Sequence, residues 1–123
     1  MAKVLFDRKK FINKMDKLWS LKVREVGICE LCSRKGDIKS FDAHHLRGRG
    51  NQSTRWDLDN GVCLCKGCHR FKVHMDTFTT GILIKKLEKK RGDGWWKRIE
   101  RKSNQSLYYT NKDLEEIYGH LQD

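Results

Sequence analysis

Residues 41–50, FDAHHLRGRG, and residues 59–74, DNGVCLCKGCHRFKVH, decide the fold of this chain. Four of the five cysteines form two CxxC pairs, and 32 residues lie between the pairs. The pairs are Cys29/Cys32 and Cys65/Cys68. Two thiolates in one tight turn can reach the same ion, and two such turns supply the four ligands of a closed, tetrahedral zinc site. The pattern therefore predicts a structural Zn²⁺ site that ties the two segments together.

The fifth cysteine, Cys63, leaves the exact ligand set open. In a strand it would share a face with Cys65, so it could compete as a ligand or serve as a small buried hydrophobe. His69 could also replace one thiolate. Four cysteines are the preferred set because that choice leaves the histidines available for other chemistry. Cysteines in CxxC pairs are typical of metal ligation in a reducing cytosol rather than of a disulfide framework.

The composition favours a small basic protein that binds a polyanion. A length of 123 residues suits one domain, 1–123, and 37% hydrophobic residues build a thin core that a metal would help to stabilise. The formal net charge is +11, which favours a polyanion as a partner, although a soluble basic protein without such a partner is the plain alternative. No stretch approaches the ~18 apolar residues of a membrane span, and no apolar segment follows the basic N-terminal residues. We therefore expect a cytoplasmic protein without a membrane partner.

The order of apolar patterns predicts an α+β chain in three parts. A basic amphipathic helix is expected within residues 1–28, with apolar positions at three- and four-residue spacing over residues 3–26. The zinc clamp and a compact core follow in residues 29–75. A helical extension is expected in residues 76–123.

Within the core, IKSFDAHHL and NGVCLC predict two strands, and KGCHRFKVHM predicts a helix. The polar segment between the strands predicts an irregular loop. Because most loops are shorter, a loop of this length suggests a functional role. In the extension, one helix is expected to end at Gly92 and a second to be capped by Asp93. A third should begin at a capping box formed by Thr110 and Asp113.

A group of polar side chains falls between or just after the cysteine pairs, where the zinc site would bring the side chains together. They are Asp42, His44, His45, Asn60, His69 and His74. Phosphodiester hydrolysis needs a base to activate water and a cation to neutralise the developing charge. Histidine, with a pKa of about 6.5, suits the base. Histidine, carboxylate and amide oxygens suit a divalent ion with open positions, so the group favours metal-dependent hydrolysis.

Three motifs together form a recognisable pattern: DAHH at residues 42–45, Asn60, and CxxCH at residues 65–69. Asn60 follows His45 by fifteen residues, and His69 follows Asn60 by nine. In this pattern the chain resembles the HNH endonucleases, the ββα-metal nuclease family. The resemblance covers residues 29–74. It implies a small zinc-stabilised ββα-metal (HNH) core flanked by N- and C-terminal helices. It also implies a metal-dependent DNA endonuclease.

The same resemblance implies a role for each matching residue. His45 would be the general base. His44 and His69 would hold the catalytic ion, Mg²⁺ or Mn²⁺. Asn60 would hold the loop and orient His45, or ligate the ion as in some branches of the family. Asp42 would support a ligand or ligate the ion itself.

One position departs from the family pattern. Some members carry a further histidine four residues after the equivalent of His69, where this chain has Val73 and then His74. The third protein ligand is therefore open between Asp42, Asn60 and His74.

A narrower resemblance rests on FDAHHLRGRG, RWDLDNG, the cysteine-rich knuckle and the helical tail, which are similar to phage recombination endonucleases of the NinG/Rap type. It implies action on branched recombination intermediates, like a Holliday junction resolvase, in the cytoplasm of a bacterial or phage-infected host cell. That group often has a glycine before the active-site histidine, whereas His44 stands here. A junction has two positions to cut, so a junction substrate would imply a homodimer joined through the helical flanks.

Six cations flank the proposed base and metal site and are expected to contact DNA phosphates. They are Arg47, Arg49, Arg55, Lys66, Arg70 and Lys72. Phosphate contacts position a strand without reading its sequence. Because no helix-turn-helix or finger pattern is present, we expect weak sequence specificity or recognition of DNA shape.

Two other classes of function fit part of the pattern. A non-catalytic zinc-stabilised DNA-binding module would account for the cysteines and the charge. It would leave His44, His45, Asn60 and His69 unexplained. A structural subunit of a packaging or recombination complex is the third reading.

Overall fold

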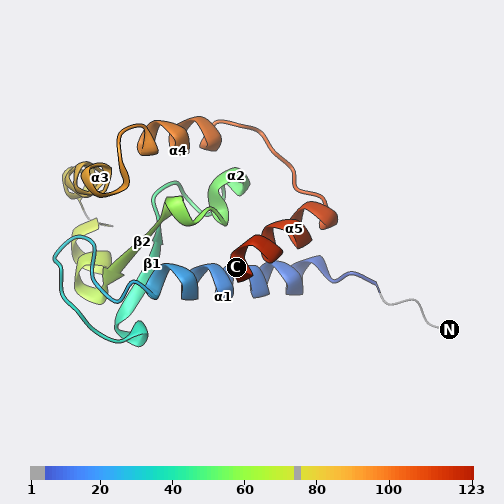
Figure 1. Cartoon of the computed structure of the whole chain (residues 1–123), viewed down its shortest axis with the longest axis horizontal. Helices are drawn as coiled ribbons and strands as arrows, with labels where there is room; N and C mark the ends of the chain where they lie inside the picture. Colours follow the sequence, from blue (N-terminus) through green and yellow to red (C-terminus); the bar gives the residue numbers. More distant parts are fainter. Residues whose placement is uncertain (1–4, 74–75) are drawn as a thin grey trace.

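The computed structural model describes residues 5–73 and 76–123, with the backbone alone at 71–73. Its helices and strands are α1 (Arg8–Arg24), β1 (Phe41–His45), α2 (Gln52–Arg55), β2 (Gly61–Cys65), α3 (Thr77–Arg91), α4 (Trp95–Ser103) and α5 (Asn111–Gln122) (Figure 1). Two 3₁₀ segments and a π-helical segment complete the order: η1 (Ile38–Ser40), η2 (Leu58–Asn60) and η3 (Cys68–Val73). The α+β class predicted from the sequence is confirmed.

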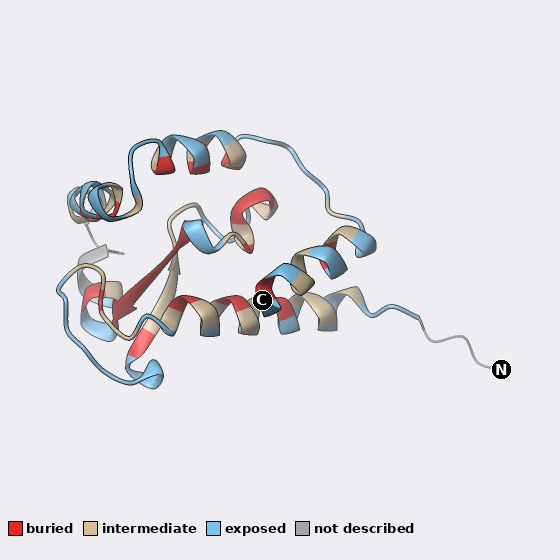
Figure 2. Cartoon of the chain, in the orientation of Figure 1, coloured by how far each residue is buried: buried red, intermediate tan, exposed pale blue. Residues whose placement is uncertain are grey.

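The two strands form an antiparallel pair in which Phe41 lies opposite Cys65 and His45 lies opposite Gly61. Every residue of β2 is buried, whereas β1 buries only its first residue (Figure 2). Side chains alternate along a strand, so Asp42 and His44 share one face of β1 and Ala43 and His45 share the other. The sheet therefore separates the two histidines that adjoin in sequence.

Helix α1 covers the Ala43 and His45 face of the sheet. Its buried residues, Met15, Trp19 and Val23, recur at four-residue spacing and form one apolar stripe. The first residue of β2 has to be glycine here, because a Cβ at Gly61 would lie 2.5 Å from Val23 Cγ2 and 2.8 Å from Trp19 Cζ2. This close approach fixes α1 against the start of β2.

The segment between the strands is more regular than the sequence predicted. It contains α2 and η2, and α4 packs on both. In Figure 1 the strands and α2 lie between α1 and α4, while α5 lies beside α1. The buried side chains of α4 are Trp95, Ile99 and Ser103. The segment is thus held from both sides.

The helices begin and end where local capping interactions place them, and two of the predicted helix starts need correction. The first helix begins at Arg8, later than expected, because the Asp7 side chain accepts a hydrogen bond from the backbone N–H of Lys10. Gly92 ends α3 with a φ of 99°, as predicted. The prediction that Asp93 caps α4 is wrong, since Gly94 is the cap at a φ of 88° that favours glycine.

The capping box at the start of α5 is confirmed. The Thr110 hydroxyl accepts from the Asp113 N–H at 3.1 Å, and the Asp113 carboxylate accepts from the Thr110 N–H at 2.8 Å. Within residues 5–73 and 76–123, no helix combines the length and apolar character that a membrane crossing requires.

Candidate metal centre and histidine site

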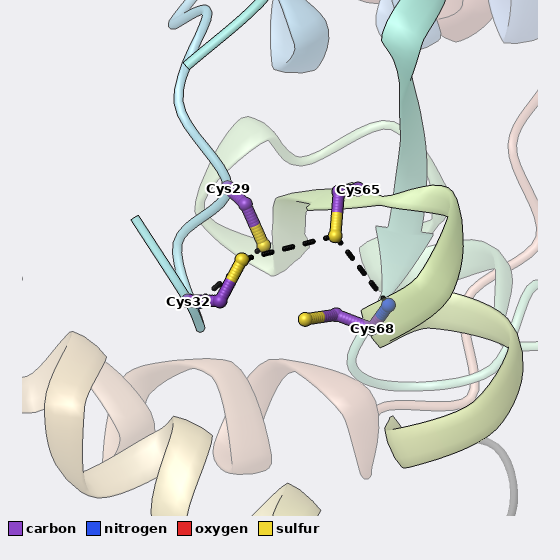
Figure 3. Close-up of side chains that lie close together, drawn as sticks. All are labelled: Cys29, Cys32, Cys65 and Cys68. Atoms are coloured by element: carbon purple, nitrogen blue, oxygen red, sulfur yellow. Dashed lines mark hydrogen bonds between the residues drawn. The ribbon is translucent and has the colours of Figure 1, made fainter. Parts of the chain in front are cut away.

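The four cysteines of the CxxC pairs come together as predicted. All four sulfur atoms lie within 4.8 Å of one another, and the Sγ atoms of Cys32 and Cys65 are 3.8 Å apart. A tetrahedral zinc ion with Zn–S bonds of about 2.3 Å places its sulfurs about 3.8 Å apart. Figure 3 shows the four side chains pointing toward a common centre from two segments of the chain. The geometry and the donor set therefore fit Zn²⁺.

The two CxxC turns have the same local geometry. The Cys32 N–H points to Cys29 Sγ at 3.5 Å, and the Cys68 N–H points to Cys65 Sγ at the same distance. In the first turn, Ser33 takes a φ of 68° and its N–H bonds to the Cys29 carbonyl at 2.8 Å. The second turn starts from the last residue of β2. One pair is thus carried by a loop and the other by the strand end.

The acidities of the thiols show why a cation belongs at this centre. Burial raises the pKa of Cys29, but the backbone N–H groups around its sulfur outweigh burial and bring the pKa down to about 7. Burial raises the pKa of Cys68, and the neighbouring sulfurs raise it further. Four adjacent thiolates repel one another, so a divalent cation is needed to hold all four ionised.

Cys63 lies outside this centre. It is fully buried, and burial raises the pKa of its thiol to about 11. Its backbone pairs with Glu30, whose N–H donates to the Cys63 carbonyl at 2.8 Å and whose carboxylate accepts the Cys63 N–H at 2.9 Å. Cys63 therefore acts as a small buried hydrophobe in the core.

On the opposite face of β1 from α1, Asp42 and His44 meet His69 of η3. The Asp42 carboxylate lies 2.9 Å from His69 Nδ1 and also pairs with Lys66. The His44 and His69 rings meet edge to face with centroids 5.1 Å apart. Burial raises the pKa of Asp42, but Lys66 and His69 outweigh it and lower the pKa below its usual range. A carboxylate on one ring nitrogen is the usual way of orienting a metal-binding histidine.

This second group is more open than the cysteine centre. Across residues 5–73 and 76–123, the four cysteines are the only His, Cys, Asp or Glu cluster with ligand atoms close enough to hold an ion directly. His44 and His69 are brought together, but they do not form a cluster at ligand spacing with Asp42. The alternative third ligand, His74, lies outside the described residues.

His45 is held on the α1 side of the strand. Its Nε2 lies 2.9 Å from the Arg55 carbonyl, which can only accept, so Nε2 carries the proton and Nδ1 is the basic nitrogen. Its ring stacks on Trp19 with centroids 3.8 Å apart. Burial lowers the pKa of His45, and the Arg55 carbonyl and the Asp16 charge only partly oppose this. The imidazole is therefore neutral at pH 7, the state that a general base requires.

Asn60 closes the segment that carries Arg55. Its amide is fully buried, and its oxygen accepts from the Arg47 N–H at 2.8 Å. Its nitrogen donates to the carbonyls of Arg47 and Thr54 at 3.1 and 3.2 Å. These three bonds tie the two ends of the segment together and fix the turn from which the Arg55 carbonyl reaches His45.

The predicted DNA-contacting cations occupy different surroundings. Arg47 lies over the Trp96 ring at 5.2 Å, with Glu100 3.8 Å away. Arg49 has 63% of its side chain exposed, whereas Arg55 has only 17%. Lys66 is exposed just before η3, and Arg70 is exposed within it. The side chain of Lys72 is outside the described part of the chain.

The sequence predictions missed Asp16 of α1, which organises this side of the site. Its carboxylate accepts from Arg55 Nη2 at 2.6 Å, from Trp56 Nε1 at 2.9 Å and from Arg49 Nη2 at 3.0 Å. Burial raises the pKa of Asp16, and these donors outweigh it and lower the pKa. The signal was present in the sequence, because Asp16 is the one acidic residue within Arg8–Arg24.

Together these residues form a four-cysteine cluster that fits a metal ion, a neutral histidine with one fixed nitrogen, and a histidine supported by a carboxylate beside a second histidine. In general, a neutral histidine can accept a proton from water, and a bound cation can neutralise developing negative charge. The chain matches no protein-family model, and no curated protein or solved structure matches it at a significant level.

Proposed function

We propose that this chain is a metal-dependent DNA endonuclease of the HNH type, with Zn²⁺ on the four cysteines as a structural ion. The observation that carries the proposal is the contact between His45 Nε2 and the Arg55 carbonyl, on a segment closed by Asn60. It leaves a neutral imidazole whose basic nitrogen is Nδ1, and His45 is one of the residues that line an open surface pocket. A histidine held only for packing would not need its tautomer set in this way.

In the proposed reaction, His45 Nδ1 accepts a proton from water as the water attacks the phosphorus. The Arg55 carbonyl stabilises the imidazolium that forms, and the Asp16 carboxylate adds a favourable charge nearby. His44 and His69 would hold Mg²⁺ or Mn²⁺, with Asp42 orienting His69. When bound, that cation supplies charge neutralisation of the phosphate and of the leaving 3′ oxygen.

The proposed substrate is DNA, and within DNA a branched recombination intermediate. The formal net charge of +11 supports a polyanionic substrate, because each phosphate contact releases counterions. Exposed Arg49 lines the same pocket as His45, and exposed Arg70 lines the same pocket as His69. Phosphate contacts of this kind favour DNA shape over sequence.

The test is cleavage of a four-way junction and of a linear duplex with the same arm sequences, in Mg²⁺ or Mn²⁺. We expect the wild type to cut the junction preferentially and His45→Ala to cut neither, with zinc content and DNA binding retained. Equal cutting of both substrates would support a nuclease but would contradict a preference for junctions. Absence of His45-dependent cutting by a folded zinc protein would overturn the proposal.

The second candidate function is a non-catalytic zinc-stabilised DNA-binding module. One observation favours it: only the cysteine cluster, among the described residues, has ligand atoms at metal-binding spacing. A Mn²⁺ titration of the zinc-loaded protein separates the two. A second, weaker site that is lost in His44→Ala supports the endonuclease, and binding of zinc alone supports the module.

A further inference from the structure

We propose that the groove between α1 and β1 binds the phosphate next to the reacting one on a single nucleic-acid strand, through Arg24, Lys39 and Arg70. This inference rests on the proposed function, because it takes His45 as the position of the reacting phosphate. It adds a phosphate site made largely by residues outside the HNH motif. None of the six cations singled out in the sequence comes from α1 or from η1.

Two surface pockets form the groove. The larger has a volume of about 630 Å³ and contains Lys39, Arg70 and His69 among its lining residues. The smaller, about 340 Å³, contains His45. Both are lined by Ser20, Arg24 and Ala43, so they meet over the middle of β1. The groove therefore runs from the proposed base to the carboxylate-supported histidine.

Arg24 is preset to receive an anion where the two pockets meet. Its Nε donates to the Ser20 carbonyl at 3.2 Å and hydroxyl at 3.0 Å, and its Nη1 donates to the Ile38 carbonyl at 3.3 Å. Its Nη2 has no hydrogen-bond partner among the described residues. A guanidinium already held in place loses little side-chain entropy when it binds a phosphate.

The charge of the larger pocket is strongly positive. Lys39 of η1 and Arg70 of η3 are exposed and form no ion pair with another described residue. The only carboxylate that lines the pocket, Asp42, is already paired with Lys66 and His69. Cations from three separate elements thus converge with no unpaired acidic group beside them, which is the arrangement that favours a phosphate.

The spacing along β1 agrees with one nucleotide step. The pockets meet at Ala43, two residues before His45, and two residues of a strand span about 7 Å. Successive phosphates of an extended nucleic-acid strand are separated by a comparable distance. One strand lying along β1 would therefore place the reacting phosphate between His45 and the ion that His44 and His69 would hold, and the next phosphate at Arg24, Lys39 and Arg70.

The test compares two charge-matched double variants in a His45→Ala background, so that binding is measured without cutting. Lys39→Gln with Arg70→Gln removes two groove cations. Lys89→Gln with Arg101→Gln removes two exposed cations elsewhere. Fluorescence anisotropy of a labelled single-stranded oligonucleotide, without added Mg²⁺, gives affinity as a function of salt.

We expect the groove variant to lower the slope of log affinity against log salt by about 0.7, because the groove cations hold one phosphate and each single-strand phosphate contact contributes about 0.7. The control variant should keep the wild-type slope. Equal slopes in the two variants, with zinc content and folding intact, would overturn the groove site. Arg24 is left unchanged because its bonds to Ser20 and Ile38 also support the fold.

A second arm places the site relative to the cut. A neutral methylphosphonate is introduced at single positions on either side of the scissile phosphate, and cutting is measured with active His45. We expect one adjacent position to slow the wild type but not to slow the groove variant further. Additive losses would overturn the placement. Absence of any cutting, with the slope change present, would refute the nuclease and retain the phosphate site.

Discussion

The imidazole of His45 stacks on the indole of Trp19, with ring centroids 3.8 Å apart and planes inclined by 10°. The indole is itself fixed, because its Nε1 donates to the Asp57 carbonyl at 3.0 Å. Trp19, a residue of the N-terminal helix, thus packs against one face of the proposed general base, His45. Helix α1 belongs to the candidate site and does more than cover the sheet.

Replacing Trp19 should separate its packing from its hydrogen bond. Trp19→Ala is expected to lower the free energy of unfolding by about 3–5 kcal/mol, because it removes a large buried side chain. Trp19→Phe keeps a ring beside His45 and should cost much less, about 1 kcal/mol for the lost bond to Asp57 plus a packing change. Urea denaturation of the zinc-loaded protein measures both. Similar losses in the two variants would show that the ring itself contributes little.

Asp16→Asn should impair cleavage more than binding. The amide cannot neutralise Arg55 and Arg49, so the segment that presents the Arg55 carbonyl to His45 loosens. We expect a lower kcat with a nearly unchanged KM, and a loss of about 1.5–3 kcal/mol in stability for hydrogen bonds to charged groups. Asp93→Asn, an exposed change of the same kind, is the control. If Asp16→Asn lost stability but kept the wild-type kcat, Asp16 would be purely structural.

The lowered pKa of His45 predicts a pH dependence of both stability and rate. The unfolded chain, with a histidine pKa of about 6.5, binds the proton more readily than the folded chain does. The stability contributed by the neutral ring is complete above the unfolded pKa and is lost as pH falls through the lower folded value. Cleavage should fall over the same range, because the base must be neutral.

Free energies of unfolding are measured from neutral to mildly acidic pH for the wild type and His45→Gln. The difference between them isolates His45 from the acid sensitivity of the zinc site. We expect the wild type to lose more stability than His45→Gln as the pH is lowered through this range. Parallel curves would contradict a buried, neutral His45.

Cysteine substitutions should distinguish the metal ligands from Cys63. Cys68→Ser removes one of four converging sulfurs and should abolish stoichiometric zinc binding and cooperative folding. Cys63→Ala removes a buried thiol outside the cluster and should keep one zinc per chain, at a cost of about 1 kcal/mol. Metal analysis by atomic emission gives the zinc content. Loss of zinc from Cys63→Ala would show that Cys63 is a ligand.

Some elements were predictable because their determinants are close in sequence. A CxxC turn brings its second N–H to its first sulfur within four residues, and the Thr110–Asp113 box and the Gly92 terminus are equally local. The cap of α4 was predicted wrongly, because Asp93 and Gly94 are both plausible caps and the backbone φ decided between them. Regular structure between the strands was missed because α2 and η2 are short and rely on contacts with α4.

The sequence by itself determined the α+β class and the four-cysteine cluster. These depend on residue chemistry and on short-range spacing. Only the tertiary structure decided that Asp16 and Trp19 complete the surroundings of His45, that Arg55 is turned inward, and that Arg24 and Arg70 line the same groove. The physical reason is that these contacts join residues that are far apart in the sequence, and they exist only once α1 has packed across the sheet through its close approach to Gly61 of β2.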